Sequence, residues 1–332
     1  MTQTAVQGAQ APALNRGRLR AGLQQLLAFA SLIVIVIFFS LTSDVFFTYD
    51  NLVNNVLVST VVVGLLAVGT TFVIITGGID LSIGTGMSLC AVMSGVFIEN
   101  LGLPLWLGVL GAVLVGGLIG AVNGAAVAFF KFPPFIATLA MMLIAQGLAL
   151  VISHTSPIYF TKAPGYIDLA SGSIIPGIDV PNAVLIFFVT AIIAAILLNK
   201  TIVGRYTYAI GSNADATAIS GINVRRWTWV VYVIGGLFIG LAGVMISARL
   251  ASAQPATGQG YELQAIAAVV IGGTSLAGGK GSMVGTVIGS LIIAVLNNGL
   301  QLISVPQEWQ NVVLGCVILF AVYMDMLRRR ER

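Results

Sequence analysis

Long runs of uncharged residues constrain this chain more than any other feature of its sequence. Three of them cover residues 100–130, 132–161 and 281–307, and His154 is the only side chain within them that titrates near neutral pH. A helix that crosses a bilayer needs about 20 apolar residues, so each run is long enough for a span. Only 8% of all residues are charged, against about 25% in a soluble domain. The sequence therefore predicts an all-α polytopic membrane protein.

Ten apolar segments are expected to be transmembrane helices. The first follows Arg16, Arg18 and Arg20, and it is longer than the roughly 7–15 apolar residues of a signal peptide, so we expect an uncleaved span. Two boundaries, between spans two and three and between spans eight and nine, are glycine-rich and fit re-entrant or discontinuous helices. The predicted spans are 22–42, 55–75, 82–98, 105–128, 135–153, 182–199, 228–248, 262–278, 283–303 and 309–327.

The basic residues set the expected orientation, because Lys and Arg are enriched in cytoplasmic loops. With the N-terminus inside, 13 of the 15 basic residues lie inside and only Lys162 and Arg249 lie outside. The interpretation is a disordered cytoplasmic tail 1–21, a transmembrane domain 22–327 and a cytoplasmic tail 328–332. It places loop 200–227 in the cytoplasm and loop 154–181 outside, where that loop is either a connector or a docking surface for a partner. The positive charge then reports orientation and not nucleic-acid binding. Cys90 and Cys316 fall in predicted spans, so no disulfide is expected.

Two glycine-rich segments resemble each other. Residues 77–86 read GGIDLSIGTG and residues 272–281 read GGTSLAGGKG, with five identities at a constant offset of 195, four of them glycine. Transporters are often built from repeated halves whose broken helices lie near the substrate path. The sequence thus suggests an internal repeat, and two unrelated tight turns are the alternative.

The second of these segments also looks like a phosphate-binding loop, but it does not fit the pattern. That motif reads G-x-x-x-x-G-K-[ST], and here Thr274 stands in place of its first glycine while Gly281 follows Lys280 in place of the hydroxyl. We therefore expect no nucleotide binding, no enzymatic activity and no cofactor in this chain.

Polar residues in or near the spans are candidates for a transport pathway. Asp80 either caps the third span together with Ser82 or takes part in transport directly. Arg249 and Glu262 either form an interfacial ion pair or line the outer mouth of the pathway. No metal site is expected, because no Cys/His spacing of that kind occurs. The pathway candidates are Gly77, Gly78, Asp80, Asn54, Asn55, Arg249, Gln254, Glu262, Gly272, Gly273, Asn297 and Asn298.

The polar segment 204–227 is patterned as a short exposed helix and not as a linker. Ser212 or Asn213 can cap a helix of about 214–220, Asp215 suits the positive end of its dipole, and Gly221 is placed to end it. Such a helix is too short for a core of its own, so its exposed face is expected to meet a partner; a solvated connector is the alternative.

Four segments, 72–84, 132–142, 204–224 and 248–281, resemble the membrane-spanning permease subunits of bacterial ABC importers for monosaccharides, and the ribose permease family looks nearest. The resemblance implies an ABC importer permease fold in the bacterial inner membrane. It also implies a second permease copy as a homodimer, a periplasmic sugar-binding protein, and a separate ATPase subunit that binds ATP and Mg²⁺. The cargo it implies is a ribose-like pentose, a hexose or inositol. The residues that it assigns to ATPase coupling are Ser212, Asn213, Ala214, Asp215, Ala216, Thr217 and Gly221.

An ion-coupled secondary sugar transporter or channel is the alternative from another class. Coupling by protonation needs titratable groups along the path. Asp80 is the only such group between apolar runs, so the sequence favours the ATP-driven permease.

Overall fold

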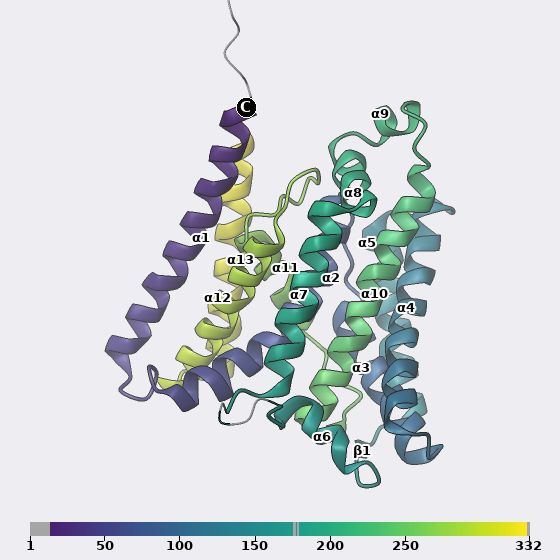
Figure 1. The fold of residues 1–332 in the computed structure, drawn as a ribbon, viewed down its shortest axis with the longest axis vertical. Coiled ribbons are helices and arrows are strands. Elements are labelled where there is room, and N and C mark those ends of the chain that lie inside the picture. Colours follow the sequence, from purple (N-terminus) through teal and green to yellow (C-terminus); the bar gives the residue numbers. More distant parts are fainter. Residues whose placement is uncertain (1–13, 175–176, 178, 331–332) are drawn as a thin grey trace, which may run out of the picture.

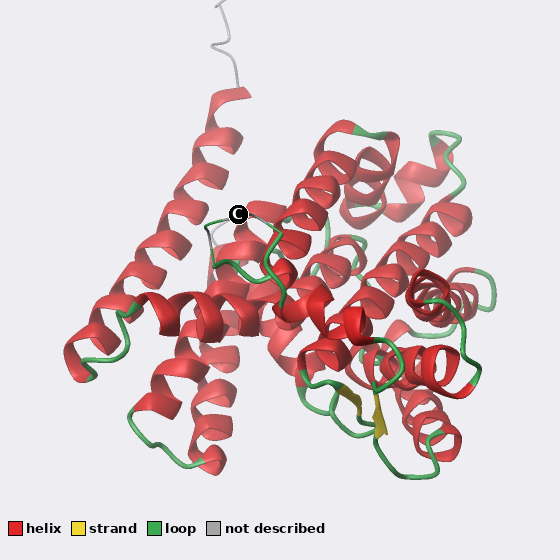
Figure 2. Cartoon of the chain, turned by 60° about the horizontal axis from the view of Figure 1, so that its bottom comes forward, coloured by secondary structure: helices red, strands yellow, loops and turns green. Residues whose placement is uncertain are grey.

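The computed structural model describes residues 14–174, 177 and 179–330 and is helical almost throughout (Figures 1 and 2). The only two strands of this described part, β1 and β2, are two residues long each and pair antiparallel. The elements are α1 (Leu14–Thr42), the π-helical turn η1 (Asn51–Leu57), α2 (Val58–Ile75), α3 (Ile83–Gly95), the π-helical turn η2 (Val96–Asn100), α4 (Leu105–Ala128), α5 (Pro134–Ile152), β1 (Ile158–Tyr159), α6 (Pro164–Ser171), α7 (Asn182–Lys200), α8 (Ile202–Ser212), α9 (Ala214–Ile219), α10 (Val224–Arg249), β2 (Ser252–Ala253), α11 (Tyr261–Ile271), α12 (Met283–Leu302) and α13 (Gln307–Arg330).

The helices confirm the predicted polytopic membrane architecture. Within the described residues, eight helices are long and apolar enough to cross a membrane, and the two remaining predicted spans fall on shorter apolar helices, Leu26–Thr42 within α1 and Tyr261–Ile271. Helix α1 begins at Leu14 and so reaches into the stretch 1–21 that was predicted to be a tail. Residues 1–13 of that tail and residues 331–332 lie outside the described part of the chain.

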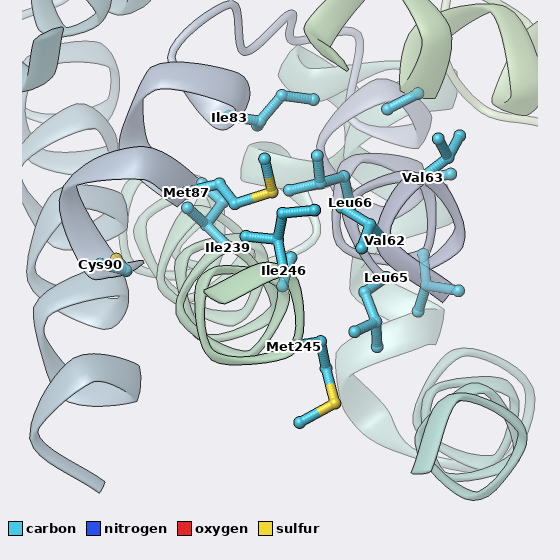
Figure 3. Close-up of a cluster of buried hydrophobic side chains, with 14 of the residues drawn as sticks. Val62, Val63, Leu65, Leu66, Ile83, Met87, Cys90, Ile239, Met245 and Ile246 are labelled. Carbon is cyan, nitrogen blue, oxygen red and sulfur yellow. The ribbon is translucent and has the colours of Figure 1, made fainter. Parts of the chain in front are cut away.

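Helix α2 forms the centre of the molecule and is buried along nearly its whole length. It contacts α7, α10, α11 and α12, and its Val, Leu and Ala side chains pack against α3 and α10 (Figure 3). Small residues allow this density, because helices in a membrane approach closely where Cβ atoms are small or absent. A Cβ atom at Gly116 of α4 would lie 2.3 Å from the carbonyl oxygen of Gly236 in α10.

The eighth predicted span, 262–278, is shorter in the structure than in the sequence prediction. Helix α11 ends at Ile271 after 11 residues, a length of about 16 Å, which is too short for a hydrocarbon layer of about 30 Å. Gly273 has a φ of +89°, a conformation that residues with a Cβ rarely adopt. The glycine-rich segment therefore interrupts the helix well before the predicted end of the span.

The ends of the molecule differ in construction. Helices α8 and α9 lie at one end, and α6 with β1 lies at the other (Figure 1). At the α6 end, Glu99 is buried, and its carboxylate accepts hydrogen bonds from the Thr161 backbone amide at 2.8 Å, the Thr161 hydroxyl at 2.9 Å and the Lys162 backbone amide at 2.8 Å. The pairing of Ile158 with Ala253 joins the same loop to the segment after α10. Loop 154–181 is thus an ordered cap over this end where the structure describes it.

Candidate functional site

A polar cavity of about 310 Å³ opens where α2, α10, α11, α12 and α13 meet. A cavity of this size can hold a small ligand, and a polar lining is uncommon between helices that are otherwise apolar. We call it the amide pocket because Asn and Gln side chains dominate its wall. Its lining residues are Ser59, Val63, Arg249, Tyr261, Gln264, Ala294, Asn297, Asn298, Gln301, Gln307, Gln310, Asn311 and Leu314.

Hydrogen bonds between its own residues hold part of this wall in place. Arg249 donates to the Ser59 hydroxyl at 3.3 Å, and the Asn297 amide donates to Gln264 at 3.3 Å. Within the described residues, no hydrogen bond is formed by the Gln301 side chain or by the Tyr261 hydroxyl. An Asn or Gln amide both donates and accepts, so these groups suit the hydroxyls of an uncharged polyol.

Three of the predicted pathway residues, Arg249, Asn297 and Asn298, line the amide pocket. Asn298 is also fixed structurally, because it exchanges two hydrogen bonds of 2.9 Å with Asn51 of η1. These hydrogen bonds place Asn51, the first residue of η1, against the pocket residue Asn298.

Four other predicted pathway residues lie outside the pocket lining. Gln254 is exposed and donates to Ser252 at 3.3 Å. Asn54 and Asn55 are exposed on η1 and bond to the residues one turn earlier, Asp50 and Asn51. The suggested Arg249–Glu262 ion pair does not form, because Glu262 accepts instead from the Gly260 backbone amide.

Most of the pocket wall was missed by the sequence analysis. Gln307, Gln310 and Asn311 lie at positions i, i+3 and i+4 at the start of α13, a spacing that puts three amides on one helix face. Asn297 and Gln301 repeat the i, i+4 spacing on α12. This periodicity of amides was the available signal, but nothing in the sequence indicates that these two faces meet Arg249.

Asp80 lies between α2 and α3 and is 1% exposed. Its carboxylate accepts from the Ser82 backbone amide at 2.9 Å and from the Ser82 hydroxyl at 2.6 Å. The Asn123 amide of α4 donates to that hydroxyl at 2.8 Å. Asp80 thus accepts from a backbone amide just before α3, while the N-cap residue Ser82 makes no side-chain cap hydrogen bond. Asp80 does not line the amide pocket.

The segment after α7 contains two short helices and not the single one expected. Asn213 caps α9, since its side chain accepts from the Ala216 backbone amide at 2.9 Å, and Gly221 follows with a φ of +85°. Ala214, Asp215 and Ala216 are exposed, while Thr217 is buried and donates to the Asn213 carbonyl at 2.7 Å. Ser212 is the last residue of α8, a helix of 11 residues that the sequence analysis had not separated from the loop.

The two glycine-rich segments, 77–86 and 272–281, lie against each other although 195 residues separate them. The Gly279 backbone amide donates to the carbonyl of Ile75, the last residue of α2, at 2.8 Å. Gly272 ends α11, and Gly78 packs beside the Tyr232 hydroxyl of α10. The structure thus brings Gly77 next to Ala277 and Gly278, whereas Gly272 packs against Gly285 of α12.

Comparisons with known proteins relate the chain to membrane transport permeases. A family model described as branched-chain amino acid transport system, permease component, matches residues 52–322. The ribose import permease protein of Escherichia coli (strain K12) is 44% identical over 313 residues, covering 92% of this chain and 95% of that protein. The corresponding protein of Bacillus subtilis (strain 168) is 43% identical over 304 residues, covering 91% and 93%. The xylose transport system permease protein of Escherichia coli (strain K12) is 35% identical over 366 aligned positions, covering 93% of each chain. No solved structure matches the chain.

Proposed function

This chain belongs to the family of branched-chain amino acid transport system permease components, and we propose that it is the permease subunit of an ATP-driven importer that moves a neutral monosaccharide across the bacterial inner membrane. The observation that carries the proposal is the similarity to ribose import permeases over more than 90% of both chains. The matched relatives are permeases and not enzymes. The amide pocket supports an uncharged cargo, because its lining holds one cationic side chain and no carboxylate.

The pocket and the exposed helix α9 suggest how the subunit is arranged in its complex. Arg249, at the end of α10, belongs to the few basic residues assigned to the outside by charge distribution. The pocket therefore opens toward the periplasm and receives sugar from a binding protein. Helix α9 lies on the cytoplasmic side with both chain termini, and it docks a separate ATPase subunit that binds ATP and Mg²⁺. A second permease copy completes the translocation unit.

Uptake by reconstituted vesicles tests the energy source. The chain is purified with its ATPase partner, inserted into liposomes, and supplied with a sugar-loaded binding protein. We expect labelled ribose or xylose to accumulate only when ATP is present on the α9 side, and collapse of proton and sodium gradients to leave uptake unchanged. Uptake that follows an ion gradient without ATP would establish the ion-coupled alternative instead.

A substitution on α9 tests the docking of the ATPase. Ala216→Glu places a charge on an exposed position of α9, so we expect loss of ATPase co-purification while the chain still inserts into the membrane. Ala256→Glu, an exposed alanine on the loop after β2 at the far end, is the matched control. Equal recovery of the ATPase with both variants would refute α9 as the docking site.

A further inference from the structure

Three segments far apart in the sequence meet backbone to backbone at the end of α8. A Cβ atom added to Gly211 would lie 1.7 Å from the Ile75 carbonyl oxygen and 2.5 Å from the Gly279 nitrogen. A Cβ atom at Gly278 would lie 2.9 Å from the Gly77 nitrogen and 3.0 Å from the Gly211 oxygen. We call this contact of Ile75, Gly77, Gly211, Gly278 and Gly279 the glycine junction. It leaves no room for a side chain at Gly211.

A side chain from one turn earlier on α8 makes a second tie to the same place. The Tyr208 hydroxyl donates to the Gly281 carbonyl at 2.9 Å, and residues three apart on a helix share a face. Burial raises the pKa of Tyr208 above its ordinary value, so the phenol keeps its proton and remains a donor at neutral pH. Helix α8 therefore holds segment 272–281 at two points, through Gly211 and through Tyr208.

The end of α8 that bears Gly211 is joined directly to α9. Asn213 is the C-cap of α8, where its backbone amide donates to the Ala209 carbonyl at 3.0 Å, and it is also the N-cap of α9, where its side chain accepts from the Ala216 backbone amide. Only Ser212 separates Gly211 from the residue shared by the two helices. A displacement of α9 consequently reaches the glycine junction without passing through a flexible linker.

We propose that Gly211 is a positioning residue through which movement of α9 displaces the segments 77–86 and 272–281 together. Its role is steric: the absence of a Cβ lets the α8 backbone bear on the end of α2 and on the segment before α12 at once. The two segments lead into α3 and α12, so one displacement of α9 moves both membrane helices together. The inference rests on the proposed docking of an ATPase on α9.

The test compares sugar transport with ATP hydrolysis in the same vesicles. Gly211→Ala in the assembled complex forces the α8 backbone away from the junction, while α9 and its exposed face stay intact. We expect the number of sugar molecules imported per ATP hydrolysed to fall about tenfold, within the range of typical coupling energies between sites. The rate of ATP hydrolysis and the recovery of the ATPase subunit should remain near wild type. An unchanged ratio overturns the inference.

Gly204→Ala is a matched control on the same helix. Its added Cβ would also lie 1.7 Å from a carbonyl oxygen, that of Leu198, but this contact is at the α7–α8 corner and its nearest atoms all belong to Leu198. Gly147→Ala, with no atom within 4 Å of the added Cβ, sets the baseline. We expect Gly204→Ala to lower the yield of folded protein and to keep the ratio of sugar to ATP. A loss of the ratio equal to that of Gly211→Ala would show a general packing defect and refute the specific role.

Tyr208→Phe gives a milder second variant that removes one hydroxyl and adds no atom. We expect the ratio to fall about fivefold, the effect of one hydrogen bond worth roughly 1 kcal/mol; a ratio equal to that of wild type would remove the second tie from the inference. Failure of the wild-type chain to bind an ATPase would overturn the proposed function itself. Full coupling in both wild type and Gly211→Ala would overturn only the glycine junction.

Discussion

Asn298 and Asn51 show what a single residue reveals before and after the fold is known. Asn298 was expected near the pathway from its place in a span, and it does line the amide pocket. Its partner lies 247 positions away, and no local pattern could indicate that pairing. Caps are predictable in the same molecule because they involve neighbours in the sequence, as Asn213 and Ala216 do. Residue type thus predicted which groups are polar, whereas their partners depended on the packing of helices.

Gln301 is the pocket residue whose removal best tests sugar recognition, because its side chain makes no hydrogen bond within the described part of the chain. Gln301→Leu keeps the approximate size and removes both the donor and the acceptor. We expect the initial rate of sugar uptake to fall about fivefold for each hydrogen bond lost, with ATP hydrolysis unchanged. Uptake is measured at saturating binding protein and normalised to inserted permease.

Gln254→Leu is the control for this experiment, since Gln254 is exposed nearby but does not line the pocket. It should transport normally. A normal rate for Gln301→Leu, or equal losses in both variants, would remove the amide pocket from the sugar pathway.

Glu99 is the residue whose loss should loosen the α6 end. Glu99→Ala leaves the Thr161 amide, the Thr161 hydroxyl and the Lys162 amide without their acceptor. A hydrogen bond to a charged group contributes about 1.5–3 kcal/mol, so we expect a lower thermal unfolding temperature and faster proteolysis within 154–163. Asp168→Ala, an exposed carboxylate on α6, should change neither quantity. Identical protease sensitivity in the two variants would contradict the anchoring role of Glu99.

At the scale of elements, apolar length predicted helices well and glycine predicted their interruptions less well. The eighth span was predicted to reach residue 278, with a glycine-rich break between it and the ninth span, and α11 ends earlier, at Ile271. Helix α8 was missed for the opposite reason: its polar, glycine-containing sequence has weak helix propensity, and its contacts with α2, α7 and α10 stabilise it. Tertiary packing thus decided α8, whereas the backbone conformation at Gly273 ended α11.

The interruption after α11 predicts a strong effect of Gly273→Leu. A residue with a Cβ at a φ of +89° is strained by about 1–2 kcal/mol. We expect sugar uptake per inserted molecule to fall. Gly315→Leu in α13 is the suitable comparison, since its Cβ meets no atom within 4 Å. Normal uptake by Gly273→Leu would make the interruption a plain structural turn.

At the scale of the whole molecule, the two similar glycine-rich segments each follow a helix that runs from the amide pocket toward the glycine junction. Helix α2 begins at Val58, next to the pocket residue Ser59, and ends at the glycine junction. Helix α11 begins beside the same pocket at Tyr261 and leads into the same junction. The sequence suggested related halves on these few glycines alone. That the two helices enclose one pocket is a property of the fold, since α2 contacts α11 and α12 from within the bundle.

The orientation of the whole chain can be tested by labelling single cysteines. Cys316 is exposed and is replaced by Ser, while Cys90 is buried and stays. Ser156→Cys and Ala218→Cys then place thiols at exposed positions of opposite ends. Because basic residues concentrate on the α9 side, a membrane-impermeant maleimide added to spheroplasts should label Ser156→Cys alone. Labelling of Ala218→Cys alone would reverse the proposed topology.

Helix α2 has a consequence for the energetics of the complex. It comprises 18 residues, about 27 Å of helix, and it bears the pocket residues Ser59 and Val63 near its beginning and Ile75 of the glycine junction at its end. Two ligands that act on one equilibrium must influence each other equally. If nucleotide bound to the partner changes the affinity of the pocket for sugar, then sugar in the pocket changes the affinity of the partner for nucleotide by the same factor. In that case the permease not only transports the sugar but also reports to the ATPase that sugar occupies the pocket.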